Sequence, residues 1–316
     1  MYKILSIDGG GIKGIAPASL LAIIEETTGE NIAEYFDLMV GTSTGGIIAL
    51  GLGLGFSARE LLSLYMDNGE KIFKKKWAFT NIMAGLFAPK NVTGPLQNLL
   101  RSKFKNKLLG QSKVRLAIPA FDIVNNNICI FKTSHHDRLQ MDHKISAEDV
   151  ALATCAAPYY FPPHRTTTNR YLVDGGMFAN NPILLGVVEG LTLLNWPKEE
   201  IYVLSLGCSE ETPEYSKLAE KNPGIVHWGR ELVDLAFNSQ SFYALRTAKL
   251  LLDDRDNTKI MRISPVLSKG DVALDDVRKS NKLEGIGHEN ARRYGRKIRG
   301  VFLAEKAQPF IPCHNL

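Results

Sequence analysis

The sequence predicts an α/β fold with a mostly parallel sheet that helices cover on both faces. Two observations lead to this prediction. Short apolar segments such as YKILSI (2–7) and IYVLSL (201–206) have the composition of strands buried on both faces. They alternate along the chain with longer segments that have the apolar periodicity of helices, which is the order found in parallel α/β sheets.

The expected elements follow one another from the N-terminus to about residue 207. Strands are expected at 2–7, 36–40, 114–121, 128–132, 171–173 and 201–206, and helices at 14–29, 45–54, 147–157 and 181–194. Beyond 207 the pattern becomes helical and polar, with one further strand near 259–263. We therefore predict a core over 1–207 and a mainly helical extension over 208–316 that packs on it.

Composition narrows the class of protein. Of the 316 residues, 45% are hydrophobic and 22% are charged, which is typical of a folded globular chain. The most apolar stretch, 36–56, contains Asp37 and several glycines, so a buried strand, turn and helix explain it better than a membrane span. The four cysteines lack metal-binding spacing and predict reduced thiols in a cytoplasmic protein, and MYKILSIDGGG lacks the pattern of a secretory signal. The net charge of +5 permits an anionic partner without identifying one.

A serine lies between two glycines in GTSTG (41–45), where an apolar strand ends and an apolar helix begins. This setting is typical of a nucleophile elbow, in which the serine occupies a strained turn. Gly41 and Gly45 would then be required, because only residues without a side chain fit beside such a turn. An ordinary glycine-rich turn is the alternative, and it would give Ser43 no chemical role.

A glycine run, DGGGIKG (8–14), lies between the first strand and its helix. It matches the Gly-x-Gly-x-x-Gly fingerprint of dinucleotide-binding proteins, but the second strand does not end in the acidic residue that holds the ribose. A phosphate-binding loop fails as well, because Lys13 is followed by glycine instead of serine or threonine. The remaining use is an oxyanion hole made of glycine amides. Lys13 is either a solvated lysine or a group that attracts an anionic substrate.

A serine nucleophile needs a base, and the seven histidines offer no motif for one. Three of them are expected at the surface because they lie in the polar segment SHHDRLQMDHK: His135, His136 and His143. Surface or packing positions also explain the others, but three stay open as candidate bases: His164, His227 and His288.

A carboxylate is the better candidate for the base. Asp174 follows an apolar strand in YLVDGGMFANNP (171–182) and precedes Gly175 and Gly176. An aspartate at the carboxyl end of a strand faces the edge where the sites of α/β proteins are built. Asp174 lies far from Ser43 along the chain, so only the fold would bring the two together. The alternative is a turn aspartate before a capped helix.

Taken together, these motifs resemble the patatin-like phospholipase family. The resemblance rests on DGGGIKG, GTSTGG and DGG in this order, and on two longer stretches, ATCAAPYYFPP (153–163) and DGGMFANNP (174–182). In the C-terminal part it includes Asn238-Ser239-Gln240 and LDDVRKSNKLEGI. It covers roughly residues 3–295. At one mild departure, Cys155 stands where the family often has serine, and we interpret this cysteine as packing.

The resemblance implies a three-layer sandwich and a Ser–Asp dyad, with Ser43 as nucleophile, Asp174 as base and no catalytic histidine. It also implies an oxyanion hole from a run of backbone amides: Gly9, Gly10, Gly11 and Ile12. The implied reaction is hydrolysis of fatty-acyl esters of membrane phospholipids through an acyl-enzyme, with no metal, other cofactor or nucleic acid. Two alternatives stay open: a triad carboxylesterase for small soluble esters that uses His227 or His288, and a non-catalytic nucleotide-binding module.

Two basic clusters are candidate contacts for anionic ligands. The first combines lysines with an aromatic residue, which suits docking on anionic lipid, although a charged helix face is the alternative: Lys74, Lys75, Lys76 and Trp77. The second is either a solvated helix face or a phosphate site: Arg292, Arg293 and Arg296.

The resemblance extends to bacterial members of about this size. These include anti-phage effectors that a cyclic nucleotide activates and that degrade the cell's own membrane. It therefore implies a cytoplasmic enzyme that acts at the inner face of the membrane, with a cyclic dinucleotide as activator and a second copy of the chain as a further candidate partner.

Overall fold

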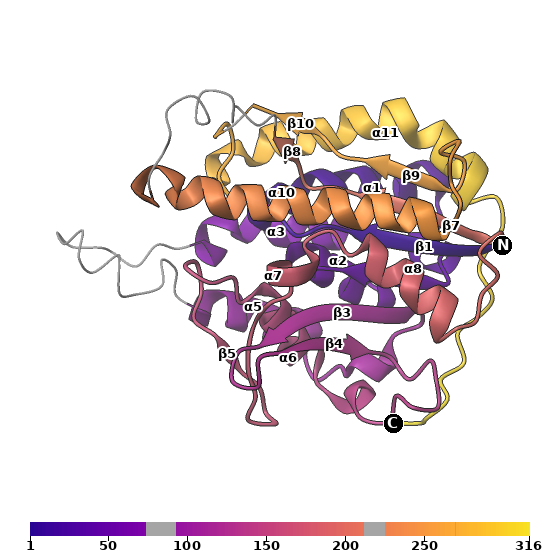
Figure 1. Ribbon diagram of the computed structural model, residues 1–316, viewed down its shortest axis with the longest axis horizontal. Coiled ribbons are helices and arrows are strands. Elements are labelled where there is room, and N and C mark those ends of the chain that lie inside the picture. The colour runs from indigo at the N-terminus through magenta and orange to yellow at the C-terminus, as the bar shows by residue number, and fades with distance from the viewer. Residues whose placement is uncertain (74–92, 212–224, 269) are drawn as a thin grey trace.

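The computed structural model describes residues 1–73, 93–211, 225–268 and 270–316 (Figure 1). In this part of the chain eight strands form one sheet in the order β5-β6-β3-β2-β1-β7-β9, with β4 paired to β3. The strands are β1 (Tyr2–Ile7), β2 (Leu38–Gly41), β3 (Arg115–Asp122), β4 (Asn127–Lys132), β5 (His164–Arg165), β6 (Tyr171–Asp174), β7 (Ile201–Leu206) and β9 (Ile260–Ile263). A second, two-stranded sheet pairs β8 (Glu210–Glu211) with β10 (Val266–Leu267).

The five central strands are parallel, which confirms the predicted mostly parallel sheet. They are β3, β2, β1, β7 and β9. At one side of the sheet the direction changes, because β4 and β6 each run antiparallel to β3, and β5 runs antiparallel to β6. This change of direction determines where the last residue of β6 lies relative to the central strands.

Helices cover both faces of the sheet, as the sequence predicts (Figure 1). Side chains alternate between the faces along each central strand, so Leu5 and Ile7 join one apolar core while Ile4 joins the other. The first core includes residues of α1, α2, α3, α5, α6 and α11, and the second includes residues of α8 and α10. The molecule therefore has three layers, with the sheet in the middle.

The helices are α1 (Ile15–Thr28), α2 (Thr44–Gly53), α3 (Ala58–Ile72), α5 (Thr93–Phe104), α6 (Ala147–Cys155), α7 (Gly176–Ala179), α8 (Ile183–Thr192), α10 (Ile225–Leu251) and α11 (Ser280–Phe302). Short 3-10 turns are η1 (Gly11–Gly14), η2 (Ile32–Tyr35), η3 (Leu109–Gln111), η4 (Asp142–Lys144) and η5 (Val277–Lys279). Among the residues that the structure describes, none of these helices is both long and apolar enough to span a bilayer.

The C-terminal segment shares the sheet and the core with the rest of the chain. The strand expected near 259–263 is present as β9, which extends the sheet beside β7. Helix α11 packs along α1 at backbone distance, since a Cβ at Gly287 would lie 2.5 Å from the Ser19 Cβ and 2.6 Å from the Ala16 carbonyl oxygen. This segment therefore helps to build the sheet edge and both helical layers, with α11 in the first core and α10 in the second.

Two glycines of α11 provide a matched test of this packing. We expect Gly287→Ala to lower the free energy of unfolding by about 1–3 kcal/mol, because the new methyl group overlaps α1. Gly285 has no atom within 4 Å of an added Cβ, so Gly285→Ala should raise the free energy of unfolding by about 0.5–1 kcal/mol through helix propensity alone. Urea denaturation of both variants measures these effects, and equal values would contradict the close approach of α11 to α1.

Candidate active site

Ser43 occupies the strained turn between β2 and α2. Its φ is 55° and its ψ is −121°, which lies in the left-handed half of the backbone map that a residue with a side chain rarely enters. The turn is tight because a Cβ at Gly41 would lie 2.2 Å from the Gly45 carbonyl oxygen. A Cβ at Gly45 would lie 2.3 Å from the carbonyl oxygen of Ile7. No side chain fits at either glycine, and the serine side chain is presented at the start of α2.

Asp174 lies beside this serine. The Ser43 hydroxyl donates a hydrogen bond to the Asp174 carboxylate, which also accepts one from the Gly176 amide at 2.7 Å. The carboxylate is buried, and burial raises its pKa to about 6 against the opposing effect of these two hydrogen bonds. A carboxyl group with this pKa is ionised at neutral pH and is a stronger base than an exposed aspartate.

The route by which Asp174 reaches Ser43 differs from the expectation. Sequence analysis placed Asp174 where a strand ends at the carboxyl edge of a parallel sheet. Strand β6 instead runs antiparallel to β3, so it enters from that edge and stops with Asp174 opposite Ala120. The glycine that follows permits this approach, since a Cβ at Gly175 would lie 2.3 Å from the Pro119 carbonyl oxygen.

Two neighbouring residues of α6, Thr154 and Cys155, also lie against Ser43. The Ser43 amide donates to the Thr154 hydroxyl oxygen at 3.0 Å, and the Thr154 hydroxyl donates to the Pro119 carbonyl oxygen at 2.7 Å. The Cys155 thiol lies in hydrogen-bond contact with the Ser43 hydroxyl. Burial and the charge of Asp174 raise the pKa of this thiol well above its usual range, so it stays neutral. Sequence analysis interpreted Cys155 as a packing residue. That interpretation was incomplete, because Cys155 lies at the end of α6 and contacts Ser43.

The glycine run passes beside Ser43, since a Cβ at Gly9 would lie 3.3 Å from the Ser43 Cβ. Two of the four amides expected in an oxyanion hole are already engaged. The Gly9 amide donates to the Asn180 carbonyl oxygen at 3.0 Å, and the Ile12 amide donates to the Leu274 carbonyl oxygen at 2.9 Å. Within the described ranges, the amides of Gly10 and Gly11 donate to no other group. The structure thus narrows the candidate oxyanion donors to these two.

A buried ion pair fixes the start of the glycine run, and sequence analysis missed it. Arg262 of β9 donates to both carboxylate oxygens of Asp8, at 2.8 Å and 2.6 Å, and to the Ser205 hydroxyl oxygen at 2.9 Å. Burial raises the pKa of Asp8, and the arginine opposes this effect. The only signal in the sequence is an arginine inside the apolar strand IMRI, and nothing there indicates its partner.

The histidines do not form a triad with Ser43 in the described part of the chain. His164 is hydrogen-bonded to Asp149 at 2.8 Å, and His288 is exposed on α11. The side chain of His227 lies outside the described residues. The predicted surface positions of His135 and His143 are wrong, since both are buried, and His135 is hydrogen-bonded to Glu189 at 2.8 Å. Polar residues flank these histidines in the sequence, but in the fold His135 lies against Glu189 of α8, and His143 lies against His314 of the C-terminal tail.

Neither of the two basic clusters is found near Ser43 in the part of the chain that the structure describes. Residues 74–77, with their three lysines and Trp77, lie outside the described residues. The arginines at 292, 293 and 296 lie on the exposed face of α11. Helix α11 runs in the same direction as α1, with Gly287 beside Ala16 and Gly295 beside Ile24, so this face lies toward the end of the sheet away from Ser43. No group of three metal-binding side chains occurs in the ranges that the structure covers.

A serine presented on an elbow and paired with an ionised base acts as the nucleophile of serine hydrolases. The fold and the site thus assign the chain to the serine ester hydrolases. Comparison with known proteins refines the class, because the patatin-like phospholipase model matches residues 5–186. The chain belongs to the patatin-like phospholipase family.

Similar curated proteins extend over nearly the whole chain. A cGAMP-activated phospholipase from Pseudomonas aeruginosa is 32% identical over 319 residues, covering 99% of this chain and 95% of the relative. A cGAMP-activated phospholipase from Escherichia coli is also 32% identical, over 336 residues, covering 98% of this chain and 94% of the relative. Patatin-like protein 4 from Arabidopsis thaliana is 28% identical over 342 residues, covering 94% of this chain and 83% of the relative.

The Asp8–Arg262 pair provides a test of how the glycine run is held. We expect Arg262→Met to lower the free energy of unfolding by roughly 3–5 kcal/mol, because it leaves a buried carboxylate without its partner. Adding Asp8→Asn should recover part of this loss, since the double variant no longer buries an unpaired charge. Urea denaturation of the single and double variants measures the coupling. A double variant that is less stable than Arg262→Met would show that the pair does not act as described.

Proposed function

We propose that this enzyme hydrolyses fatty-acyl ester bonds of membrane phospholipids with Ser43 as nucleophile and Asp174 as base. The observation that carries the proposal is the hydrogen bond from the Ser43 hydroxyl to a buried carboxylate whose pKa is raised to about 6. A base is most effective when its pKa lies near the working pH, because it is then both deprotonated and able to hold a proton.

In the first half-reaction, the Ser43 Oγ attacks the ester carbonyl carbon and its proton moves to the Asp174 carboxylate. The carbonyl oxygen becomes an oxyanion, which the amides of Gly10 and Gly11 stabilise. Collapse of this intermediate breaks the ester C–O bond and forms the acyl-enzyme. The proton on Asp174 passes to the departing oxygen, and the lysophospholipid leaves as an alcohol.

In the second half-reaction, Asp174 takes a proton from water as the water oxygen attacks the acyl carbon. The same two amides stabilise the second oxyanion. Collapse releases the fatty acid, and the proton held by Asp174 returns to the Ser43 oxygen. Atoms and charges balance over the cycle, which consumes one water for each ester bond.

We further propose that a cyclic dinucleotide activates the enzyme at the inner face of the membrane. The support is that two relatives similar over nearly the whole chain are named cGAMP-activated phospholipases. Membrane contact through residues 74–77 stays part of this proposal on the strength of the sequence alone, because basic and aromatic residues together favour anionic lipid.

Fatty-acid release from mixed phospholipid vesicles, measured with and without cGAMP, tests the chemistry. We expect Ser43→Ala to lower release by about 1,000-fold or more, because the nucleophile is lost. We expect His288→Asn, which alters a histidine exposed on α11, to release fatty acid at the rate of the unaltered chain. Loss of activity in His288→Asn or His227→Asn, with small soluble esters preferred over vesicles, would favour a triad esterase instead.

The pKa of Asp174 predicts how the rate depends on pH. Below a pH of about 6 the carboxyl group is protonated and cannot accept the Ser43 proton, so kcat/KM should fall as pH falls. The expected slope is about tenfold per pH unit below that value, with a plateau above it. Asp174→Asn should remove this dependence together with most of the activity. A rate that rises only above pH 7 would point to a base other than Asp174.

A further inference from the structure

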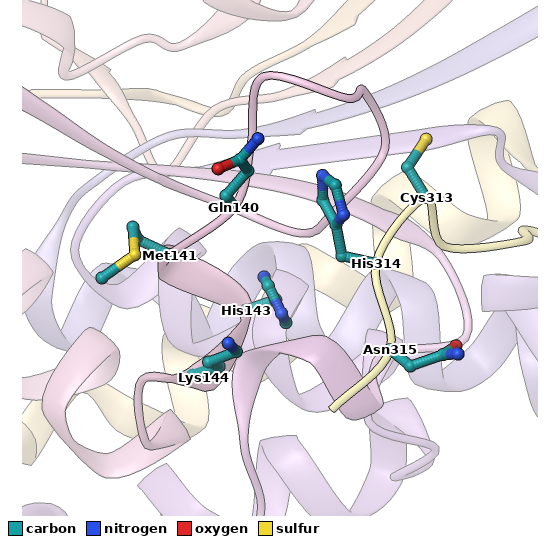
Figure 2. Close-up of a pocket in the computed structure, with 7 residues that line it drawn as sticks. All are labelled: Gln140, Met141, His143, Lys144, Cys313, His314 and Asn315. Atoms are coloured by element: carbon teal, nitrogen blue, oxygen red, sulfur yellow. The ribbon is translucent and has the colours of Figure 1, made fainter.

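A pocket lies between the C-terminal tail and the loop around η4 (Figure 2). Its lining includes no residue of the Ser43 site. Its volume is about 560 Å³, which is within the range of small-molecule sites. Seven residues line it, four from the loop and three from the tail: Gln140, Met141, His143, Lys144, Cys313, His314 and Asn315.

The tail is pinned in place as one wall of the pocket. The Cys313 amide donates to the Ser134 carbonyl oxygen at 2.7 Å, and the His314 amide donates to the Ser134 hydroxyl oxygen at 2.8 Å. The His314 ring is hydrogen-bonded through Nε2 to the Asp137 carbonyl oxygen at 2.8 Å. These bonds anchor the end of the chain on the loop that carries η4.

His143 is the unusual residue of this pocket. Its side chain is only 1% exposed, yet neither Nδ1 nor Nε2 has a hydrogen-bond partner among the described residues. Buried polar atoms are nearly always paired, so this imidazole points to a group that completes the site. Its ring stacks on that of His314, with 6.1 Å between centroids and 21° between planes.

The residues that line the pocket indicate which kind of ligand would bind beside His143. None of the seven side chains is acidic, and Lys144 provides an exposed ammonium group that can bind a phosphate. Gln140 and Asn315 provide amides that can donate to or accept from a base edge. The half-buried His314 ring, which stacks on His143, offers a flat surface on which a nucleobase can stack. Cation, amides and stacked rings together match a phosphate-bearing nucleotide better than a free phosphate.

The position of the pocket links it to the nucleophile. Residues 142–144 form η4, and two residues later the Ser146 side chain caps α6 by accepting from the Asp149 amide at 3.1 Å. Helix α6 then spans nine residues, or about 13 Å, and ends with the two residues that contact Ser43. A ligand that shifts η4 therefore shifts the helix end that holds the Ser43 amide and hydroxyl.

We propose that this pocket is the effector site for a cyclic dinucleotide and that α6 transmits its binding to Ser43. The proposal rests on the nucleotide activation proposed above and gives that activation a location. Activation of this kind requires that η4 and α6 adopt two different arrangements and that the ligand bind one of them more tightly than the other.

Titration calorimetry of the full chain with cGAMP tests the location. We expect Lys144→Gln to raise the Kd by about tenfold or more, because one charge-assisted hydrogen bond is lost. The matched control is Lys198→Gln, which removes the same charge at another exposed lysine and should leave the Kd unchanged. His143→Leu should also weaken binding, but it alters a buried residue, so its thermal unfolding is measured alongside. A triple glutamine variant of residues 292, 293 and 296 tests the rival phosphate site on α11.

Fatty-acid release measured in parallel separates the outcomes. The proposal predicts that Lys144→Gln shifts the cGAMP concentration for half-maximal release by the same factor as the Kd. It also predicts that cGAMP slows amide hydrogen exchange over 147–155. Unchanged cGAMP binding in Lys144→Gln, or loss of binding only in the triple variant, overturns the pocket as the effector site. Inorganic phosphate binding as tightly as cGAMP overturns the nucleotide assignment. Release of fatty acid by a chain that binds no cGAMP overturns this inference and leaves the lipase chemistry standing.

Discussion

The hydrogen bond between the Ser43 hydroxyl and the Asp174 carboxylate is the interaction around which the site is built. The carboxylate must be removed from water to become a useful base, and it must also stay ionised. Burial alone would push its pKa far upward, whereas hydrogen bonds from Ser43 and the Gly176 amide lower it. The resulting value of about 6 is a balance between these opposing effects, and it is attained only where both donors are held in place.

Glycines make this balance geometrically possible. At two points around the site, backbone segments approach each other so closely that an added side chain would overlap neighbouring backbone atoms. At Gly45 the elbow lies against the carbonyl oxygens of Ile7 and Asp8, and at Gly175 the end of β6 lies against Pro119. The conformational entropy that glycine loses on folding is the cost of this close approach. The elbow also lies beside the glycine run, since a Cβ at Gly9 would lie 3.3 Å from the Ser43 Cβ.

Much of this arrangement follows from local sequence, and the rest depends on contacts that local sequence does not encode. Strand and helix periodicity predicts the central parallel sheet, and the GTSTGG and DGG motifs identify Ser43 and Asp174. The antiparallel direction of β6 was not predictable, because four residues of strand carry no sign of direction. The pairing of Asp8 with Arg262 joins residues 254 positions apart, and only the complete sheet brings them together. His143 was misplaced because polar neighbours indicate exposure only where no other segment covers them, and here the C-terminal tail does.

The candidate oxyanion donors lie in a glycine run that is held by a part of the chain outside the match to the family model. That match ends at residue 186, yet the two contacts that frame the glycine run come from beyond it. Arg262 holds Asp8 at the start of the run, and the Leu274 carbonyl oxygen accepts from the Ile12 amide at its end. A Cβ at Gly11 would lie 2.3 Å from that same carbonyl oxygen, so the run is confined between β1 and the C-terminal segment. In this chain the C-terminal segment therefore holds the glycine run that carries the Gly10 and Gly11 amides. Under the proposed mechanism a change in this segment would alter the rate without any change in Ser43 or Asp174, because an oxyanion-hole donor contributes a factor of about 100 or more.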